Sequence, residues 1–152
     1  MKWKCFIGTR KINVRLDLYQ AETARIAQEQ AAALAMAKAI LATGRSLTSL
    51  EQNGVLHALQ ILIENAIGKG KHLLKSRGLS VPISGYDTFK ALSDCDLVPS
   101  AELNTWKSLV GMRNRIVHDY MNIDMDQVIL MLKGNKEQFV VDFLRQDIAR
   151  IK

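Results

Sequence analysis

The fold is decided by the stretch Val55–Leu74, VLHALQILIENAIGKGKHLL. One apolar stripe consists of Val55, Leu59, Leu62, Ala66 and Leu73, and Leu56, Ile63, Ile67 and Leu74 lie beside it. Intervals of three and four residues are the period of an amphipathic α-helix with one face in a core. Thr48 or Ser49 is placed to cap this helix, with Glu51 in its first turn and Gly78 at its end. The stretch therefore predicts a long helix.

Helical patterns lie on both sides of this stretch. An alanine-rich run from Val14 to about Thr43 predicts a first long helix that stops at Gly44. A short helix is expected from Tyr86 to about Asp94, and a fourth helix is expected to be capped by Ser100. Leu103, Trp106, Leu109 and Val110 give this fourth helix its apolar positions.

A last helix is expected from about Asp124 to Ile151, weakened around Gly134 and Asn135. Its inward positions are Val128, Leu132, Phe139, Phe143 and Leu144. No segment alternates apolar and polar residues over more than about four positions, as a half-buried strand would. The sequence therefore predicts an all-α antiparallel helical bundle of about five helices, in which the three longest pack nearly antiparallel.

The composition fits one globular domain over residues 1–152, with a basic lead-in at 1–12. Twenty-one Lys and Arg against 15 Asp and Glu give a net charge of +6, which favours a polyanionic partner such as RNA. Cys5 and Cys95 are too few for a disulfide framework or a zinc site. We find no membrane span and no secretory signal, and expect a cytoplasmic protein without cofactor or metal.

The segment Arg113–Tyr120, RNRIVHDY, gathers two guanidiniums, an imidazole, a carboxamide, a carboxylate and a phenol near the end of the fourth helix. On a straight helix Asn114 and Arg115 would share a face with His118, whereas Arg113 would lie about 140° and Tyr120 about 160° away from His118. The three side chains could not then share one cleft. We therefore expect the helix to break between Val117 and Met121.

The spacing of Arg113, His118 and Tyr120 matches R-x4-H-x-Y, and the sequence here resembles the HEPN superfamily, in particular its HepT-like ribonuclease toxins. Asn114 matches the polar residue that usually follows the arginine. Three further stretches resemble parts of that family. Residues 58–66 resemble its second helix, residues 82–92 resemble the segment before the helix that carries the motif, and residues 110–115 resemble the residues that lead into the signature.

The resemblance implies a metal-independent endoribonuclease that acts as a homodimer and as the toxin of a toxin–antitoxin pair. Arg113 and His118 would be catalytic, with Asn114 and Arg115 in support. The antitoxin of that family is MntA, a small nucleotidyltransferase that attaches AMP to the signature tyrosine, here Tyr120. The resemblance thus implies that AMPylation of Tyr120 blocks the nuclease.

The residue types suit this chemistry. Metal-free RNA cleavage needs a base for the 2′-hydroxyl, an acid for the leaving 5′-oxygen, and positive charge on the phosphorane. An imidazole can do either proton transfer, and a guanidinium matches phosphate oxygens. Because one His118 does not easily do both, we expect a composite site with Arg113 and His118 from two protomers, releasing a 2′,3′-cyclic phosphate and a 5′-hydroxyl.

Other interpretations stay open at this point. The chain could be a non-catalytic HEPN subunit that binds substrate for, or regulates, a nucleotidyltransferase. Arg113 could form a surface ion pair, for instance with Asp119, and Tyr120 could simply pack its ring and hydrogen-bond its hydroxyl. His57 and His72 have no metal-ligand spacing and are interpreted as structural. The basic group of Lys69, Lys71, Lys75 and Arg77 could line an RNA path, although a solvated helix end is the simpler interpretation.

Overall fold

The structure, a computed structural model, describes residues 14–147, and side chains from residue 16. Its elements are α1 (Val14–Ala42), α2 (Ser49–Ser76), α3 (Gly85–Asp94), α4 (Leu103–His118), α5 (Met125–Lys133) and α6 (Glu137–Arg145), with short 3-10 turns η1 (Ser100–Glu102) and η2 (Tyr120–Asn122). Residues 14–147 contain no strand, so the all-α prediction is confirmed there. The expected lead-in at 1–12, Cys5 and the end of the last predicted helix at 148–151 lie outside the described residues.

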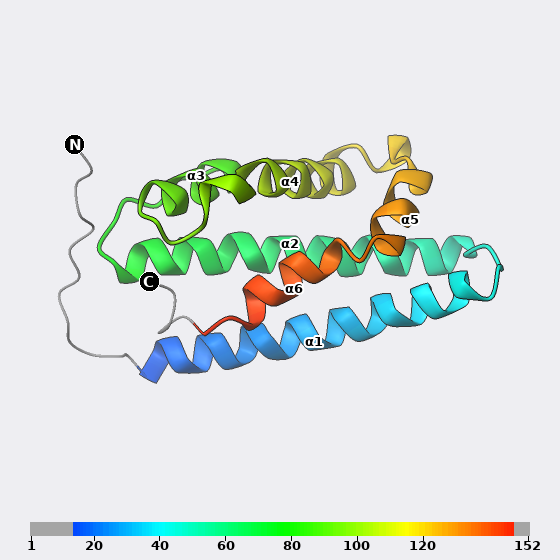
Figure 1. Ribbon diagram of the computed structural model, residues 1–152, viewed down its shortest axis with the longest axis horizontal. Coiled ribbons are helices and arrows are strands. Elements are labelled where there is room, and N and C mark those ends of the chain that lie inside the picture. Colours follow the sequence, from blue (N-terminus) through cyan, green and yellow to red (C-terminus); the bar gives the residue numbers. More distant parts are fainter. Residues whose placement is uncertain (1–13, 148–152) are drawn as a thin grey trace.

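Helix α2 lies in the middle of the molecule and contacts α1, α3, α4 and α6. In Figure 1 α3 and α4 lie on one side of α2, α1 lies on the other, and α6 crosses over the α1–α2 pair. The loop between α1 and α2 is short, so these two helices run antiparallel, as expected. None of the helices described is long and apolar enough to cross a membrane.

The start of α2 is fixed by a capping box. The Glu51 N–H donates to Oγ1 of Thr48 over 3.2 Å, and the Thr48 N–H donates back to Oε1 of Glu51 over 3.0 Å. Thr48, rather than Ser49, is therefore the N-cap. Arg45 adds two hydrogen bonds to the same carboxylate, at 2.9 and 2.8 Å. This arginine, followed by the Thr48 hydrogen bonds, lowers the pKa of Glu51 to about 2.

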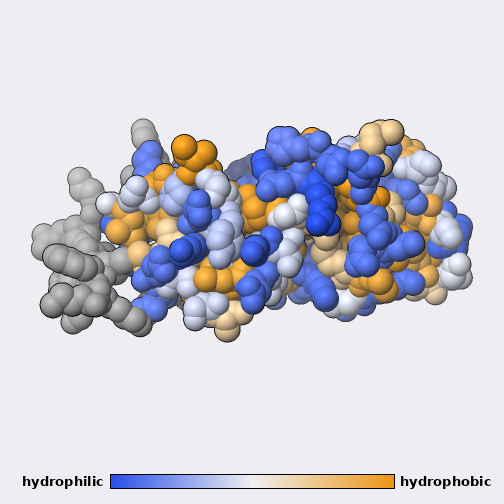
Figure 2. Space-filling view, turned by 90° about the horizontal axis from the view of Figure 1, so that it is seen from above, coloured by the Kyte–Doolittle hydropathy of each residue, from blue (hydrophilic) through white to orange (hydrophobic). Residues whose placement is uncertain are grey.

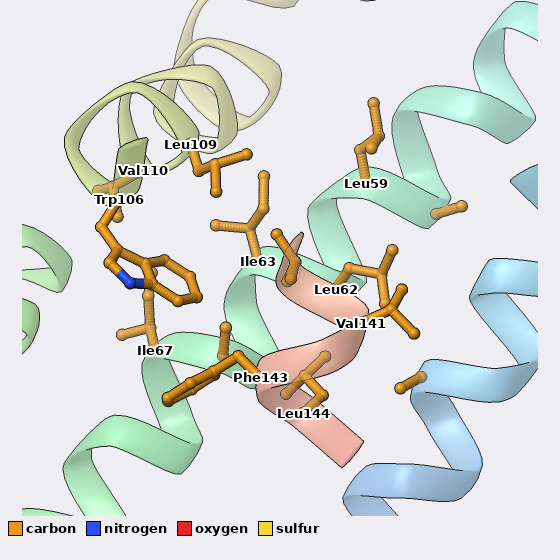
Figure 3. Packing of buried hydrophobic residues seen from close by; sticks show 14 of the residues in the cluster. Leu59, Leu62, Ile63, Ile67, Trp106, Leu109, Val110, Val141, Phe143 and Leu144 are labelled. Carbon is orange, nitrogen blue, oxygen red and sulfur yellow. The ribbon is translucent and has the colours of Figure 1, made fainter. Parts of the chain in front are cut away.

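The core is formed where α2, α4 and α6 meet (Figure 3). The Phe89 ring of α3 stacks on Trp106 of α4, with centroids 3.8 Å apart and an interplanar angle of 8°. Phe143 of α6 meets Trp106 edge-on at 4.9 Å. These buried rings join α6 to the consecutive helices α3 and α4. The labelled residues around them include Leu59, Leu62, Ile63 and Ile67 of α2, Leu109 and Val110 of α4, and Val141 and Leu144 of α6.

The prediction of one last helix is wrong, because the structure contains two helices, α5 and α6, in this part of the chain. The chain turns at residues 134–136, between α5 and α6, where Asn135 takes a left-handed φ of 54°. The Asn135 side chain accepts a hydrogen bond from Nζ of Lys38 over 2.7 Å, which holds the break against α1. The described residues thus contain six α-helices, of which only α1 and α2 are long. Val128, Leu132, Phe143 and Leu144 are buried as predicted, whereas Phe139 is half-buried.

Two further predictions need correction. Ser100 does not cap α4, because it begins the η1 turn, and α4 starts at Leu103 without a side-chain cap. Lys69 does not belong to a surface basic group, because its side chain is fully buried. Its Nζ donates to the carbonyl oxygens of Phe143 (2.8 Å), Leu144 (3.3 Å) and Gln146, at the C-terminal end of α6. A buried ammonium is tolerated here because it meets the unpaired carbonyls of a helix end.

Candidate functional site

The regular helix α4 ends at His118, within the signature segment. Asp119 leaves helical geometry with φ −140° and ψ 42°, and its N–H still donates to the Arg115 carbonyl over 2.8 Å. Tyr120 then begins the η2 turn, which is closed by a hydrogen bond from the Asn122 side chain to Asp119 over 2.7 Å. The expected break between Val117 and Met121 is confirmed.

The break turns Tyr120 back toward α2. Its phenolic O–H donates to Oδ1 of Asn53, one turn into α2. The Tyr120 side chain remains 47% exposed, so the ring is not a core residue. Its hydroxyl makes the hydrogen bond that the structural alternative expects, whereas its ring stays at the surface.

The Arg113 side chain also contacts α2, at a position that follows Asn53 along the helix. Its Nε donates to Oε1 of Glu64 over 3.3 Å, and Gln60 donates to the same oxygen over 3.1 Å. The guanidinium also donates to Oδ1 of Asn114 over 2.9 Å. Arg113 therefore does form an ion pair near the surface, as one alternative expected, but its carboxylate partner is Glu64 rather than Asp119. With about a third of its side chain accessible, Arg113 keeps a path to solvent.

His118 and Arg115 differ in position from Arg113. The His118 side chain is exposed at the last residue of α4, four residues after Asn114 and therefore on the same flank. Arg115 lies about 200° around the helix from Arg113. It lines a groove between α4 and the α5–α6 pair instead. The structure thus brings Arg113 and Tyr120 into contact with α2, with Asn114 bonded to Arg113. His118 is exposed about 140° around the regular helix from Arg113, and Arg115 faces the groove beside α5 and α6.

The groove that contains Arg115 has a volume of about 960 Å³. Its lining is mainly apolar and includes Met112, Ile116, Ile123, Met131 and Phe139. Arg113, His118 and Tyr120 are not among its lining residues within the described part of the chain. Figure 2 looks onto the α3–α4 side of the molecule, where hydrophilic and apolar side chains alternate over the surface. This groove is therefore separate from Arg113, His118 and Tyr120.

The partners that α2 provides, Asn53, Gln60 and Glu64, were not predicted as site residues from the sequence. The signal that could have identified them is their spacing. They follow one another at intervals of seven and four residues on the side of α2 opposite its buried stripe, where a packed helix usually carries unrelated polar residues. Among residues 14–147, no group of three or more His, Cys, Asp or Glu side chains is arranged to hold a metal ion.

Fold and signature together define an all-α HEPN-type domain. The model of the HepT-like family, described as ribonuclease HepT-like, matches residues 26–148, and the chain belongs to this family. One relative is the mRNA nuclease HepT of Shewanella oneidensis, which is 31% identical over 88 residues, 58% of this chain. The chain spans 66% of the length of that relative.

Solved structures support the same fold. One is a tri-AMPylated HEPN toxin of Shewanella oneidensis in complex with an MNT antitoxin, with a TM-score of 0.67 and 21% identity. The similarity covers 88% of this chain and 98% of that one. Another is a toxin–antitoxin complex with AMP-PNP, with a TM-score of 0.66, 21% identity, and coverage of 88% and 99%. Because the sequence identity is 21%, these similarities show that the fold is shared.

Proposed function

We propose that this chain is a metal-independent endoribonuclease, the toxin of a toxin–antitoxin pair, with Arg113 and His118 as catalytic residues. The observation that carries the proposal is the complete signature on a HepT-like chain, at a helix end that leaves His118 exposed and Arg113 reachable. RNA is a substrate that suits the net charge of +6.

In the proposed reaction the ribose 2′-oxygen attacks phosphorus and the bond from phosphorus to the 5′-oxygen breaks. A base takes the 2′-hydroxyl proton, and an acid gives a proton to the departing 5′-oxygen. Arg113 stabilises the added negative charge on the phosphorane, with Asn114 holding its guanidinium over 2.9 Å. The products are a 2′,3′-cyclic phosphate and a 5′-hydroxyl.

The proposal includes a homodimer with a composite site, because one His118 does not easily act as base and acid in the same turnover. Apolar side chains are exposed around the signature, with Leu50 81%, Tyr120 47% and Met121 90% accessible. Leu50 lies one turn before Asn53, which receives the Tyr120 hydrogen bond, so these side chains belong to one end of the α2–α4 pair. Exposed apolar patches of this kind favour contact with a second copy.

We further propose that an MntA-like nucleotidyltransferase antitoxin attaches AMP to Tyr120. The phenol oxygen would attack the α-phosphorus of a nucleoside triphosphate, lose its proton and displace pyrophosphate. The exposure of Tyr120 supports access by a second enzyme, and the AMPylated state of the solved Shewanella toxin is in line with it. An AMP group beside His118 would add negative charge where RNA phosphate must bind.

The test is cleavage of RNA in EDTA by protein purified without its antitoxin. We expect cleavage by the unmodified protein and loss of about 10²-fold or more in His118→Ala and Arg113→Ala. His72→Ala is the matched control, because His72 stacks on Tyr19 at the far end of α2 and should leave cleavage unchanged. Absence of cleavage by the unmodified protein would favour the non-catalytic HEPN subunit instead. Mass spectrometry after co-expression with the antitoxin should find AMP on Tyr120. An unmodified Tyr120 in an inactivated toxin would show that AMPylation of this residue does not inhibit the protein.

A further inference from the structure

One side of α2 carries a row of residues that the other helices leave at least partly exposed, although the Tyr19 hydroxyl of α1 lies close to Gly68. The residues Asn53, His57, Gln60, Glu64, Gly68, Lys71 and Lys75 follow one another at intervals of three and four, and we call them the open stripe. All seven are exposed or half-buried, whereas the buried positions of α2 lie on its other sides. The open stripe runs nearly the whole length of the helix.

Two side-chain contacts fix the signature segment beside one end of the open stripe. Tyr120 donates to Asn53, and Arg113 donates to Glu64. His57 lies between these two contacts on the same face, one turn after Asn53 and one turn before Gln60. Its imidazole is exposed. An RNA strand bound at Arg113 and His118 would therefore meet His57 if it extends onto α2.

The charge along the open stripe suits a polyanion. Glu64 is the only acidic residue in the sequence from Asn53 to Lys75, and it is paired with Arg113. Beyond Glu64 the stripe continues through Gly68, which has no side chain, to Lys71. The Lys71 ammonium donates to the Ile83 carbonyl over 2.8 Å and remains partly accessible.

Lys75, one turn further, is exposed at the last turn of α2. Its positive charge, after burial, helps to lower the pKa of neighbouring His72. Lys75 therefore places an exposed positive charge at this end of the stripe. No carboxylate of the open stripe lies beside this charge, because its only acidic member, Glu64, is 11 residues before Lys75.

We propose that the open stripe is the RNA track of this protein, in which His57 and Lys75 donate hydrogen bonds to backbone phosphates on either side of Glu64. The proposal rests on the ribonuclease function proposed above and adds the path of the strand. His57 and Lys75 are 18 residues apart, about 27 Å along the helix, which accommodates several nucleotides. Phosphate contacts of this type position a strand without reading its bases.

The test measures binding of fully 2′-O-methylated RNA, which lacks the attacking hydroxyl, at several salt concentrations. We expect His57→Ala and Lys75→Ala each to weaken binding about three- to tenfold at low salt. The slope of log K against log salt should become less steep by about 0.7 for the lost lysine contact. His72→Ala and Lys133→Ala, which alter a histidine and a lysine outside the stripe, should bind like the unaltered protein.

Three results separate this inference from the proposed function. If the unaltered protein cleaves RNA but both stripe variants bind and cleave equally well, the track is wrong and the nuclease stands. If His57→Ala changes the dimer mass rather than the RNA affinity, the stripe is a contact between copies and the track is wrong. If the variants lose binding but no protein cleaves, the track stands and the nuclease fails.

Discussion

The phenol of Tyr120 and the side chain of Asn53, 67 residues apart in sequence, form the hydrogen bond that ties the η2 turn to the start of α2. Because the tyrosine donates its proton in this contact, AMP on the phenol oxygen would remove the donor. Modification would then have a structural effect as well as an electrostatic one. The turn that follows His118 would lose its attachment to α2.

We predict that Asn53→Ala frees the η2 turn without unfolding the domain. The loss of one exposed hydrogen bond should lower the free energy of unfolding by about 0.5–1 kcal/mol. Hydrogen exchange should become faster at the Asn122 amide, which donates to the Asp119 carbonyl over 3.0 Å. Asn65→Ala, which removes a hydrogen bond to Ile61 on the same helix, is the control. Unchanged exchange in Asn53→Ala would show that the turn is held by other contacts.

We predict that Glu64 positions Arg113 for catalysis. Glu64→Ala should lower kcat about ten- to a hundredfold, because the guanidinium loses the acceptor that orients its Nε. RNA binding should not weaken, since a negative charge is removed from the site. Glu64→Gln keeps an acceptor oxygen and should recover much of kcat. The test is to measure kcat and KM for the unaltered protein, Glu64→Ala and Glu64→Gln. An equal loss of kcat in both variants would instead indicate that the negative charge of Glu64, rather than its acceptor geometry, is required.

Lys69 should give the stability of the domain a distinctive pH dependence. Burial lowers the pKa of Lys69 to about 8, although the charge of Asp147 opposes this shift. The unfolded chain, with a lysine pKa near 10.4, then binds more protons than the folded chain between about pH 8 and 10.4. The contribution of Lys69 to the free energy of unfolding should therefore become more favourable as pH rises through this window.

The measurement compares the protein with Lys69→Met, in urea, at pH 7 and pH 10. At pH 7 the variant should be less stable by about 1–3 kcal/mol, because the carbonyls of Phe143, Leu144 and Gln146 lose their donor. At pH 10 the difference should be larger. A difference that shrinks with pH would contradict the depressed pKa. It would mean that the three carbonyls keep Lys69 charged in the folded state.

Two glycines of α2 should respond oppositely to alanine. At Gly70 a Cβ would lie 2.9 Å from Cγ2 of Thr88 and 3.0 Å from Cδ1 of Leu92, both in fully buried side chains. Gly70→Ala should therefore destabilise by about 1 kcal/mol even after the gain in helix propensity. Gly54 has no atom within 4 Å of such a Cβ, so Gly54→Ala should stabilise by about 0.5–1 kcal/mol. Urea unfolding of both variants tests the pair.

Helix positions were largely predictable from local signals. The extents of α1, α2 and α3 follow from apolar period, caps and stop residues that act over a few positions. The division between α5 and α6 was only indicated, as a weakening at Gly134 and Asn135. Whether such a weak point breaks depends on tertiary contacts, and the hydrogen bond from Lys38 to Asn135 is one that the sequence does not show.

The site was predictable in part for a similar reason. The spacing of Arg113, His118 and Tyr120 is visible in the sequence, and helical geometry led to the expected break between Val117 and Met121, which the structure contains. The partners Glu64 and Asn53 depend on how α4 is placed along α2. That placement is set by core packing, for which the sequence provides the residues but not their register. Lys69 likewise looks like a surface lysine until α6 is placed over it.

Helix α2 is packed on most of its sides, and its remaining side contacts the signature segment. Most of its residues therefore contribute either to the core or to the candidate site. A deep mutational scan should find this helix the least tolerant segment of the domain, with defects of two kinds. Substitutions on the packed sides should reduce abundance in the cell. Those on the uncovered side should leave abundance intact and relieve toxicity, so a screen that reads both quantities would separate the two sides of a single helix.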